Sequence, residues 1–186
     1  TWKTKTLGTN ARRFWDNFRY REPQLEPVVL DDLECAELAE LYPTLKPRYD
    51  ALPLNVMRAD ICRVLAVYFF GGYYKDLDVD WRRPLVEWVD PSDGIVYGWE
   101  DDEHVCQWFF AARPGDPCLR NILQQITNLI ANTSAIDFNK NVEAVIDITG
   151  PGVWTDALQG CPFKPKYNFT QMRLLNVHHA YASAQW

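Results

Sequence analysis

Five charged side chains lie within a short stretch of the chain and could act together on an anionic ligand. Asp60 and Arg63 are three residues apart, on a segment rich in apolar residues. Asp76, Asp78 and Asp80 follow at alternate positions. Carboxylate oxygens are preferred ligands of Mg²⁺ and Mn²⁺, ions that keep positions open for water and phosphate. Arginine adds paired, charge-assisted hydrogen bonds to phosphate. These residue types favour a site for a divalent ion and a diphosphate.

A helix over residues 55–70 is expected to carry Asp60 and Arg63. Residues three apart on a helix share one face, so the acid and the arginine lie on the same side. The opposite, core-facing stripe consists of apolar side chains: Ile61, Val64, Leu65 and Tyr68. The helix is expected to end at Gly71 or Gly72, because glycine readily adopts the left-handed conformation that ends many helices.

A strand over residues 73–79 is expected after the glycines. Side chains alternate along a strand, so Tyr74, Asp76 and Asp78 point to the same side. Side chains two apart on a regular strand are separated by about 6.5 to 7 Å, too far for both acids to ligate one ion. We therefore expect Asp78 to bind the ion directly, and Asp76 to act through water or on a sugar or ribose hydroxyl. The alternative is a solvated acidic face that ends an edge strand.

Seven segments of the chain resemble motifs of a known family. They are TWKTKT, WDNFRYREPQLEPVVLDD, LYPTLKPRYDALP, RADICRVLAVYFFGGYYKDLDVD, FFAARPGDP, ITGPGVWTDAL and HHAYASAQW. The chain resembles the sugar-transferring glycosyltransferases with a DXD motif, in particular the Och1-like mannosyltransferase branch, and more distantly the glucosylating clostridial toxins. The resemblance covers nearly the whole chain, and the central motif is its most specific part.

The resemblance implies an α/β protein with the GT-A (Rossmann-like) fold, a mixed, mostly parallel sheet flanked by helices. The whole chain, residues 1–186, is expected to form one such catalytic domain, trimmed at both ends. The sequence pattern agrees, because apolar runs at residues 27–30 and 94–99 alternate with helical stretches at 33–41, 55–70 and 116–132. Open α/β sheets bind ligands where their strands end, which is where Asp76 and Asp78 fall.

The toxin-like pattern matches five positions with the same spacing: Asp60, Arg63, Tyr74, Asp76 and Asp78. The resemblance implies that Asp60 holds hydroxyls of the donor sugar and that Arg63 holds sugar or diphosphate oxygens. The alternative for this pair is a surface ion pair that contributes little. Trp2 matches an aromatic residue that stacks on the nucleotide base, and the alternative is an exposed terminal aromatic side chain. Gln107 is expected to contact the transferred sugar.

The closing segment offers further metal ligands. His178, His179 and Ser183 follow the apolar residues 174–177, and this region completes the metal shell in many GT-A families. Adjacent histidines on a strand face opposite sides, so we expect at most one of the two to reach the ion. The closing HHAYASAQW departs from the usual family pattern, which leaves the exact ligand open.

Three further places are candidates for the acceptor cleft. In the family, a TGP segment borders this cleft, so Gly150, Pro151 and Trp154 are candidates beside Thr149; capping of a helix that begins here is the alternative. Asp102 belongs to an acidic run, residues 100–102, that follows the expected strand 94–99 and could bind acceptor hydroxyls; a solvated loop is the alternative. Trp186 closes the chain and is assigned to the cleft as well.

The implied reaction is metal-dependent sugar transfer from a nucleoside diphosphate to a glycan hydroxyl, with retained anomeric configuration. The implied catalytic residues are Asp60, Arg63, Asp76 and Asp78. Mn²⁺ or Mg²⁺ and Arg63 stabilise the departing diphosphate, while Asp60 and Asp76 orient the sugar. No residue presents itself as a covalent nucleophile, so front-face attack is expected.

The donor stays open at this stage. GDP-mannose is the first expectation, with a mannose-containing glycan as acceptor, and UDP-glucose, UDP-galactose and UDP-N-acetylglucosamine are alternatives. A second class is a non-catalytic nucleotide-sugar or carbohydrate-binding module of the same fold. A glycoside hydrolase is disfavoured, because its two carboxylates must flank a bond across a cleft.

Composition excludes other classes. A formal net charge of −6 argues against nucleic acid as a partner. No stretch approaches the roughly 18 apolar residues of a membrane span. The five cysteines lack the spacing of a zinc site, and their odd number leaves at least one thiol free, with the pairing open. Acceptor patterns for N-glycosylation begin at Asn132 and Asn168 and would suit the Golgi lumen if the chain enters the secretory pathway; otherwise we expect the cytoplasm.

Overall fold

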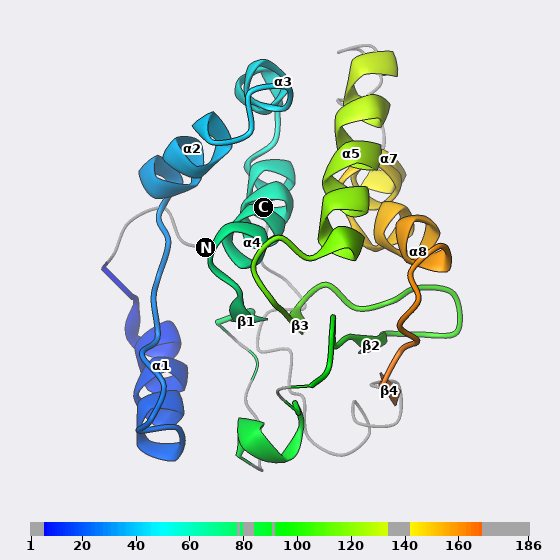
Figure 1. The fold of residues 1–186 in the computed structure, drawn as a ribbon. Helices are drawn as coiled ribbons and strands as arrows, with labels where there is room; N and C mark the ends of the chain where they lie inside the picture. Colours follow the sequence, from blue (N-terminus) through cyan, green and yellow to red (C-terminus); the bar gives the residue numbers. More distant parts are fainter. Residues whose placement is uncertain (1–5, 78, 80–83, 91, 134–141, 169–186) are drawn as a thin grey trace.

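The computed structural model of the chain describes residues 6–77, 79, 84–90, 92–133 and 142–168. The helices are α1 (Thr9–Arg21), α2 (Asp32–Glu40), α3 (Lys46–Ala51), α4 (Asn55–Phe70), the short 3₁₀ helix η1 (Leu85–Glu87), α5 (Pro117–Asn132), α7 (Val142–Ile148) and α8 (Pro151–Gln159). The strands are β1 (Gly72–Lys75), β2 (Gly98–Trp99), β3 (Phe109–Ala112) and β4 (Tyr167–Asn168). Helices α4, α5, α7 and α8 lie together beside the short strands, and α1 lies apart from them (Figure 1).

Local sequence signals explain where the helices begin and end. Asp31 caps α2 in a capping box with Glu34, in which each side chain accepts from the other residue's backbone N–H. Asp116 caps α5 and accepts from the backbone N–H groups of residues 118 and 119. Gly71 ends α4 with a φ of +70°, and a Cβ there would lie 2.6 Å from Pro114 Cδ. The helices predicted at residues 33–41, 55–70 and 116–132 are therefore confirmed, as α2, α4 and α5.

The larger hydrophobic core lies between the helices. Helix α2 packs against α4, and α5 packs against both α4 and α8. Fully buried apolar side chains from these helices fill the space between them, for example Ile61, Leu65, Leu119 and Trp154. Ile61 and Leu65 belong to the apolar stripe predicted for α4, which is confirmed as core-facing.

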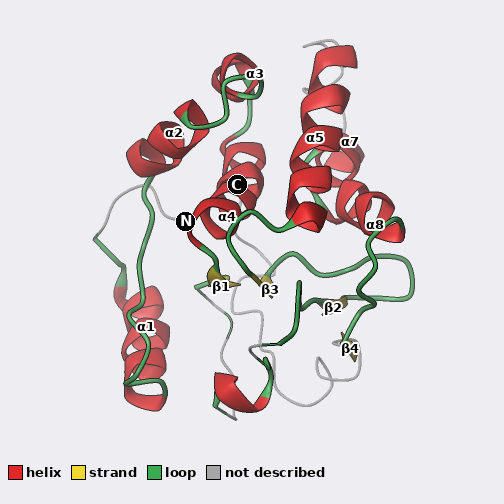
Figure 2. Ribbon diagram, in the orientation of Figure 1, coloured by secondary structure: helices red, strands yellow, loops and turns green. Residues whose placement is uncertain are grey.

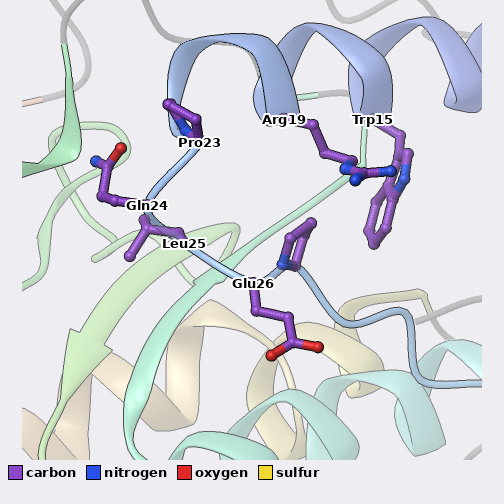
Figure 3. A pocket seen from close by; sticks show the side chains of 7 residues that line it. Trp15, Arg19, Pro23, Gln24, Leu25 and Glu26 are labelled. Atoms are coloured by element: carbon purple, nitrogen blue, oxygen red, sulfur yellow. The ribbon is translucent and has the colours of Figure 1, made fainter.

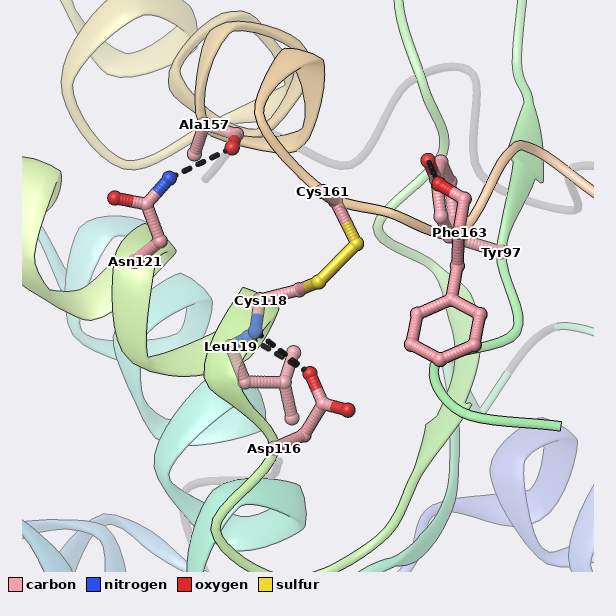
Figure 4. Close-up of a disulfide and its surroundings, with 8 residues drawn as sticks. All are labelled: Tyr97, Asp116, Cys118, Leu119, Asn121, Ala157, Cys161 and Phe163. Carbon is pink, nitrogen blue, oxygen red and sulfur yellow. Dashed lines mark hydrogen bonds between the residues drawn. A yellow bond between two sulfur atoms is a disulfide. The ribbon is translucent and has the colours of Figure 1, made fainter.

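Two disulfides tie this core together. Cys35 on α2 is bonded to Cys62 on α4, and Cys118 on α5 is bonded to Cys161 after α8. Figure 4 shows the second bond beside the capped start of α5. Cys106 is a free, buried thiol, so four cysteines pair and the expected unpaired one is found. No helix among the described residues is both long and apolar enough to cross a membrane.

Among the described residues, the strands form two small sheets rather than one large one. β1 pairs antiparallel with β3, from Gly72 opposite Ala112 to Lys75 opposite Phe109. β2 pairs parallel with β4, and Val96 forms an isolated antiparallel bridge to Ala111. Figure 2 shows how little of the described chain is strand. The predicted mostly parallel sheet is therefore not confirmed; residues 27–30 form no strand, and of residues 94–99 only the last two belong to one.

A second, smaller hydrophobic cluster lies below β1 and β3. It contains the buried residues Val79, Leu85, Cys106, Trp108 and Phe109. Phe18 and Leu25, from α1 and the loop after it, pack against this cluster. Val79 and Leu85 therefore pack in a small core of their own, apart from the core between the helices.

Candidate functional site

Helix α4 places Asp60 and Arg63 on the same face, as their spacing predicted. Arg63 Nη2 lies 3.0 Å from Asp60 Oδ1. Only 3% of Asp60 and 8% of Arg63 are exposed, so the alternative of a surface ion pair is wrong. A buried pair of charges requires further polar contacts to offset the loss of hydration.

Arg63 makes these contacts with residues in or next to β1 and β3. Its Nη1 donates to the backbone oxygen of Gln107 at 3.0 Å and lies 3.6 Å from Asp76 Oδ1. Its guanidinium lies 5.1 Å from the centroid of the Tyr74 ring, within the range of a cation–π interaction. The Tyr74 hydroxyl donates to Asp76 Oδ1 at 2.6 Å. One arginine thus joins the helix to the acid that follows β1.

Thr149 completes the contacts of Asp60. Its hydroxyl donates to Asp60 Oδ2 at 2.9 Å, and its backbone oxygen accepts from the Gln107 side-chain amide at 3.2 Å. Thr149 is fully buried. The two oxygens of Asp60 are therefore held by two different segments of the chain, and the TGP segment reaches the predicted site through its threonine.

Asp76 lies in a turn and not in a regular strand. β1 ends at Lys75. The backbone N–H of Val79 donates to the backbone oxygen of Asp76 at 3.1 Å, which is the pattern of a tight turn. We call this turn from Asp76 to Val79 the aspartate turn; its described residues are Asp76, Leu77 and Val79. The expected strand over residues 73–79 is thus wrong in its second half. We predicted a water-mediated role for Asp76 from the spacing of side chains on a regular strand. Because Asp76 lies in a turn, that spacing does not apply to it.

The surroundings shift the pKa values of the buried groups. Burial raises the pKa of Asp60 to about 7, while Arg63 and the hydrogen bond from Thr149 oppose the rise. Burial alone would lower the pKa of Arg63, but Tyr74 and the nearby carboxylates, including Glu100, raise it overall. Burial also raises the pKa of Tyr74 well above its usual value. Arg63 therefore stays charged, and Tyr74 stays a hydrogen-bond donor.

The acceptor-cleft candidates are placed differently from one another. Gly150 precedes α8, where a Cβ would lie 2.6 Å from Ile146 Cα, and Pro151 is the first residue of that helix. Trp154 has no exposed surface and packs edge-on against Phe110 with ring centroids 4.7 Å apart, so in this structure it is a core residue. Asp102 is exposed. A role for these residues in acceptor binding stays a prediction.

Several predicted site residues lie outside the described part of the chain. They are Trp2, Asp78, His178, His179, Ser183 and Trp186. Within the described part, no group of three or more His, Cys, Asp or Glu side chains is placed to hold a metal ion. Asp76 has 32% of its side chain exposed and offers hard carboxylate oxygens, so it fits one ligand position of Mn²⁺ or Mg²⁺. The remaining ligands stay predictions.

The sequence did not single out Lys75, and it named Glu100 only as part of the acidic run that could bind acceptor hydroxyls. The structure brings both residues near the site. Glu100 lies close enough to Arg63 to affect its pKa, whereas its neighbour Asp101 accepts hydrogen bonds from the backbone of its own loop. Lys75 lies behind the aspartate turn and donates to its backbone. Neither role has a local sequence signal, because both depend on contacts made after folding.

A surface cavity of about 500 Å³ lies away from these residues, between α1 and the loop after it. Figure 3 shows Trp15 and Arg19 of α1 on one side of it and Glu26 of the loop below. None of the predicted site residues that the structure describes lines this cavity. We therefore assign the candidate site to the buried network around Arg63 and to the aspartate turn.

The fold is that of a glycosyltransferase. The structure is similar to a solved protein described as "PaToxG Glycosyltransferase", with a TM-score of 0.62 and 15% sequence identity, over 95% of this chain and 68% of that one. Residues 11–94 match the family model "Glycosyltransferase sugar-binding region containing DXD motif", and this range includes Asp60, Arg63 and Asp76.

Two curated relatives narrow the resemblance further. The "Initiation-specific alpha-1,6-mannosyltransferase" of Schizosaccharomyces pombe is 30% identical, over 78% of this chain and 42% of the relative. The protein of the same name from Candida albicans is 26% identical, over 85% of this chain and 50% of the relative. The chain therefore spans half or less of the length of these relatives. Its resemblance to DXD-motif glycosyltransferases, and to their mannosyltransferase branch, is confirmed.

Proposed function

We propose that this protein is a metal-dependent glycosyltransferase that moves a sugar from a nucleoside diphosphate to a glycan hydroxyl with retained configuration. The observation that carries the proposal is the contact of Arg63 with both Asp60 and Asp76, within the segment that matches the sugar-binding family model. An arginine held between two acids is oriented before the ligand arrives, which is how a site stabilises charge that develops during a reaction.

Each residue of the network has a proposed part. Arg63 binds oxygens of the sugar or diphosphate, for which its forked donors are suited. Asp60 accepts from sugar hydroxyls when it is ionised. Asp76 is the most exposed of the three, so the donor approaches from its side. A bound Mn²⁺ or Mg²⁺ would supply positive charge beside the leaving diphosphate. Asp76 and Asp78 are the residues proposed to hold it.

We propose GDP-mannose as the donor and a mannose-containing glycan as the acceptor, because the curated relatives carry mannosyltransferase names. A UDP-sugar is the alternative donor. A binding module without activity is the alternative function, and one observation favours it. Asp60, Arg63 and Thr149 are buried and bonded to one another, as residues with a purely structural role also would be.

Release of nucleoside diphosphate separates the enzyme from the binding module. The protein is incubated with Mn²⁺ and, in turn, GDP-mannose, UDP-glucose, UDP-galactose and UDP-N-acetylglucosamine, with and without a mannose-containing glycan. Of the four donors, we expect only GDP-mannose to give release of its nucleotide as GDP and, with the glycan present, a product of higher mass. Asp76→Asn should remove both signals. Asp50→Asn, an exposed acid of α3, is the matched control and should keep them.

Two other outcomes would change the proposal. Release of UDP with transfer from a UDP-sugar would mean that the donor is a UDP-sugar and not GDP-mannose, while the proposed transferase activity would stand. Metal-dependent binding without any release, from the chain in its folded form, would favour the binding module.

A further inference from the structure

Lys75 contacts the backbone of the aspartate turn. Its Nζ donates to two backbone oxygens, that of Val79 at 2.8 Å and that of Asp76 at 3.3 Å. One ammonium group thus joins the first and last residues of the turn. The ammonium also lies 5.6 Å from the centroid of the Phe18 ring on α1. The chain around Asp76 is therefore fixed through its backbone, independently of the side-chain contacts with Arg63 and Tyr74.

Glu22 holds the other end of the same segment. This carboxylate is fully buried at the end of α1. Its Oε1 accepts from the backbone N–H of Leu85 at 2.6 Å, and its Oε2 accepts from the Gln24 amide at 2.7 Å. Leu85 and Val79 are both buried in the smaller hydrophobic cluster. A buried carboxylate is stable only when it is hydrogen-bonded, so Glu22 ties α1 firmly to the residues that follow the turn.

We propose that Lys75 and Glu22 are positioning residues that hold the aspartate turn in the geometry needed to bind a divalent ion with a nucleoside diphosphate. The proposal rests on the proposed function and adds to it the backbone contacts that set Asp76 in place. Groups that orient metal ligands commonly change metal affinity on the order of tenfold when they are removed.

Because Lys75 is charged, the direction of the change in Mn²⁺ affinity tests the proposal. A positive charge beside a cation site repels the cation, so charge alone predicts that Lys75→Met binds Mn²⁺ more tightly. Loss of positioning predicts the opposite, because the turn loses both ammonium contacts. Lys75→Arg keeps the charge and the donors, and is expected to restore binding. Lys46→Met is the matched control, since it removes the same charge from an ion pair on α3.

The experiment is a calorimetric titration of Mn²⁺ alone into the wild-type chain and these variants, with GDP added afterwards to the Mn²⁺-loaded chain and folding checked by circular dichroism. We expect Lys75→Met to weaken binding on the order of tenfold, and Lys75→Arg and Lys46→Met to bind like wild type. Glu22→Leu should weaken binding as well, while Glu22→Gln keeps an oxygen for Leu85 and should bind like wild type. Unchanged or tighter binding by Lys75→Met would overturn the proposal and leave the proposed function intact.

Amide hydrogen exchange gives a readout that needs no ligand. The N–H of Val79 donates within the turn, so its exchange should be faster in Lys75→Met than in Lys75→Arg. If the wild-type chain binds neither GDP nor UDP with Mn²⁺, the proposed function fails, and exchange still decides whether Lys75 holds the turn. Equal exchange in the two variants would overturn the positioning role.

Discussion

The two halves of the candidate site differ in burial and in what supports them. Asp60 and Arg63 lie on α4 inside the larger core, and the Cys35–Cys62 disulfide ties that helix to α2. Asp76 lies in a turn with 32% of its side chain exposed, above the smaller cluster. We therefore expect the two halves to act differently. The helix half holds a charged network, and the turn half is the part that we propose meets the ligand.

The largest effect on stability is expected from Arg63→Met. The variant removes the positive charge between Asp60 and Asp76 and leaves Asp60 buried without its partner. Breaking a buried ion pair in this way typically costs about 3 to 5 kcal/mol of unfolding free energy. Urea denaturation measures the loss. A loss below about 1 kcal/mol would mean that the network is no more than a surface pair and would contradict the comparison.

Removal of the disulfides is expected to cost nearly as much. The bonded cysteines are 43 residues apart for Cys118–Cys161 and 27 apart for Cys35–Cys62. Loop-closure entropy then predicts losses of about 4 and about 3.5 kcal/mol for the paired alanine variants. Thermal and urea unfolding check the order. Loss of the Cys35–Cys62 bond should also weaken nucleotide binding more than loss of the other, because Cys62 lies beside Arg63 on α4.

Asp76→Asn should separate function from stability. The acid is partly exposed, so its contact with Arg63 contributes little to folding, and we expect a change within about 1 kcal/mol. Nucleotide binding with Mn²⁺ should fall on the order of tenfold or more, because the amide is a poorer ligand for a hard cation. Calorimetric titration and urea denaturation on the same sample give both numbers. Equal destabilisation by Asp76→Asn and Arg63→Met would remove the distinction between the two halves.

The smallest effect is a change of stability with pH. The folded state raises the pKa of Asp60 to about 7, so it binds a proton more tightly than the unfolded chain does. The contribution of Asp60 to stability therefore falls as pH rises from about 4 to about 7 and is constant above.

Thr149→Val tests this effect, because the threonine hydroxyl lowers the pKa of Asp60. Its loss should extend the falling part of the stability curve to higher pH, and Thr149→Ser should restore the wild-type curve. Urea denaturation between pH 5 and pH 8 measures how steeply the unfolding free energy changes with pH. Asp60→Asn lacks the titrating carboxyl and therefore lacks this contribution to the slope. A wild-type curve that matches Asp60→Asn throughout would show that the pKa of Asp60 is not raised.

The helices could be predicted because their signals are local. The bounds of α4 follow from one apolar stripe and one glycine stop, and its polar pair follows from a spacing of three residues. The strands could not, because a strand is defined by its partner. Residues 27–30 are as apolar as a strand requires and yet form none, and β1 ends at Lys75 because the next residues enter a turn.

The site shows the same limit. Tyr74 and Asp76 were predicted on one side of a strand, and the Tyr74 hydroxyl does bond Asp76. Gln107 was singled out for its side chain, but Arg63 contacts its backbone oxygen. The bond from Thr149 to Asp60 joins residues 89 apart in the sequence. Such a contact depends on how the fold brings α4 and the residues between α7 and α8 together, which no local pattern contains.

The most direct test of the account is calorimetric titration of GDP and UDP into the protein, with and without Mn²⁺, repeated with Asp76→Asn and Asp78→Ala. The account predicts that one nucleotide binds only when Mn²⁺ is present and that each substitution weakens this binding on the order of tenfold or more. Binding that is equally strong without the metal, or that is unchanged by both substitutions, would contradict it.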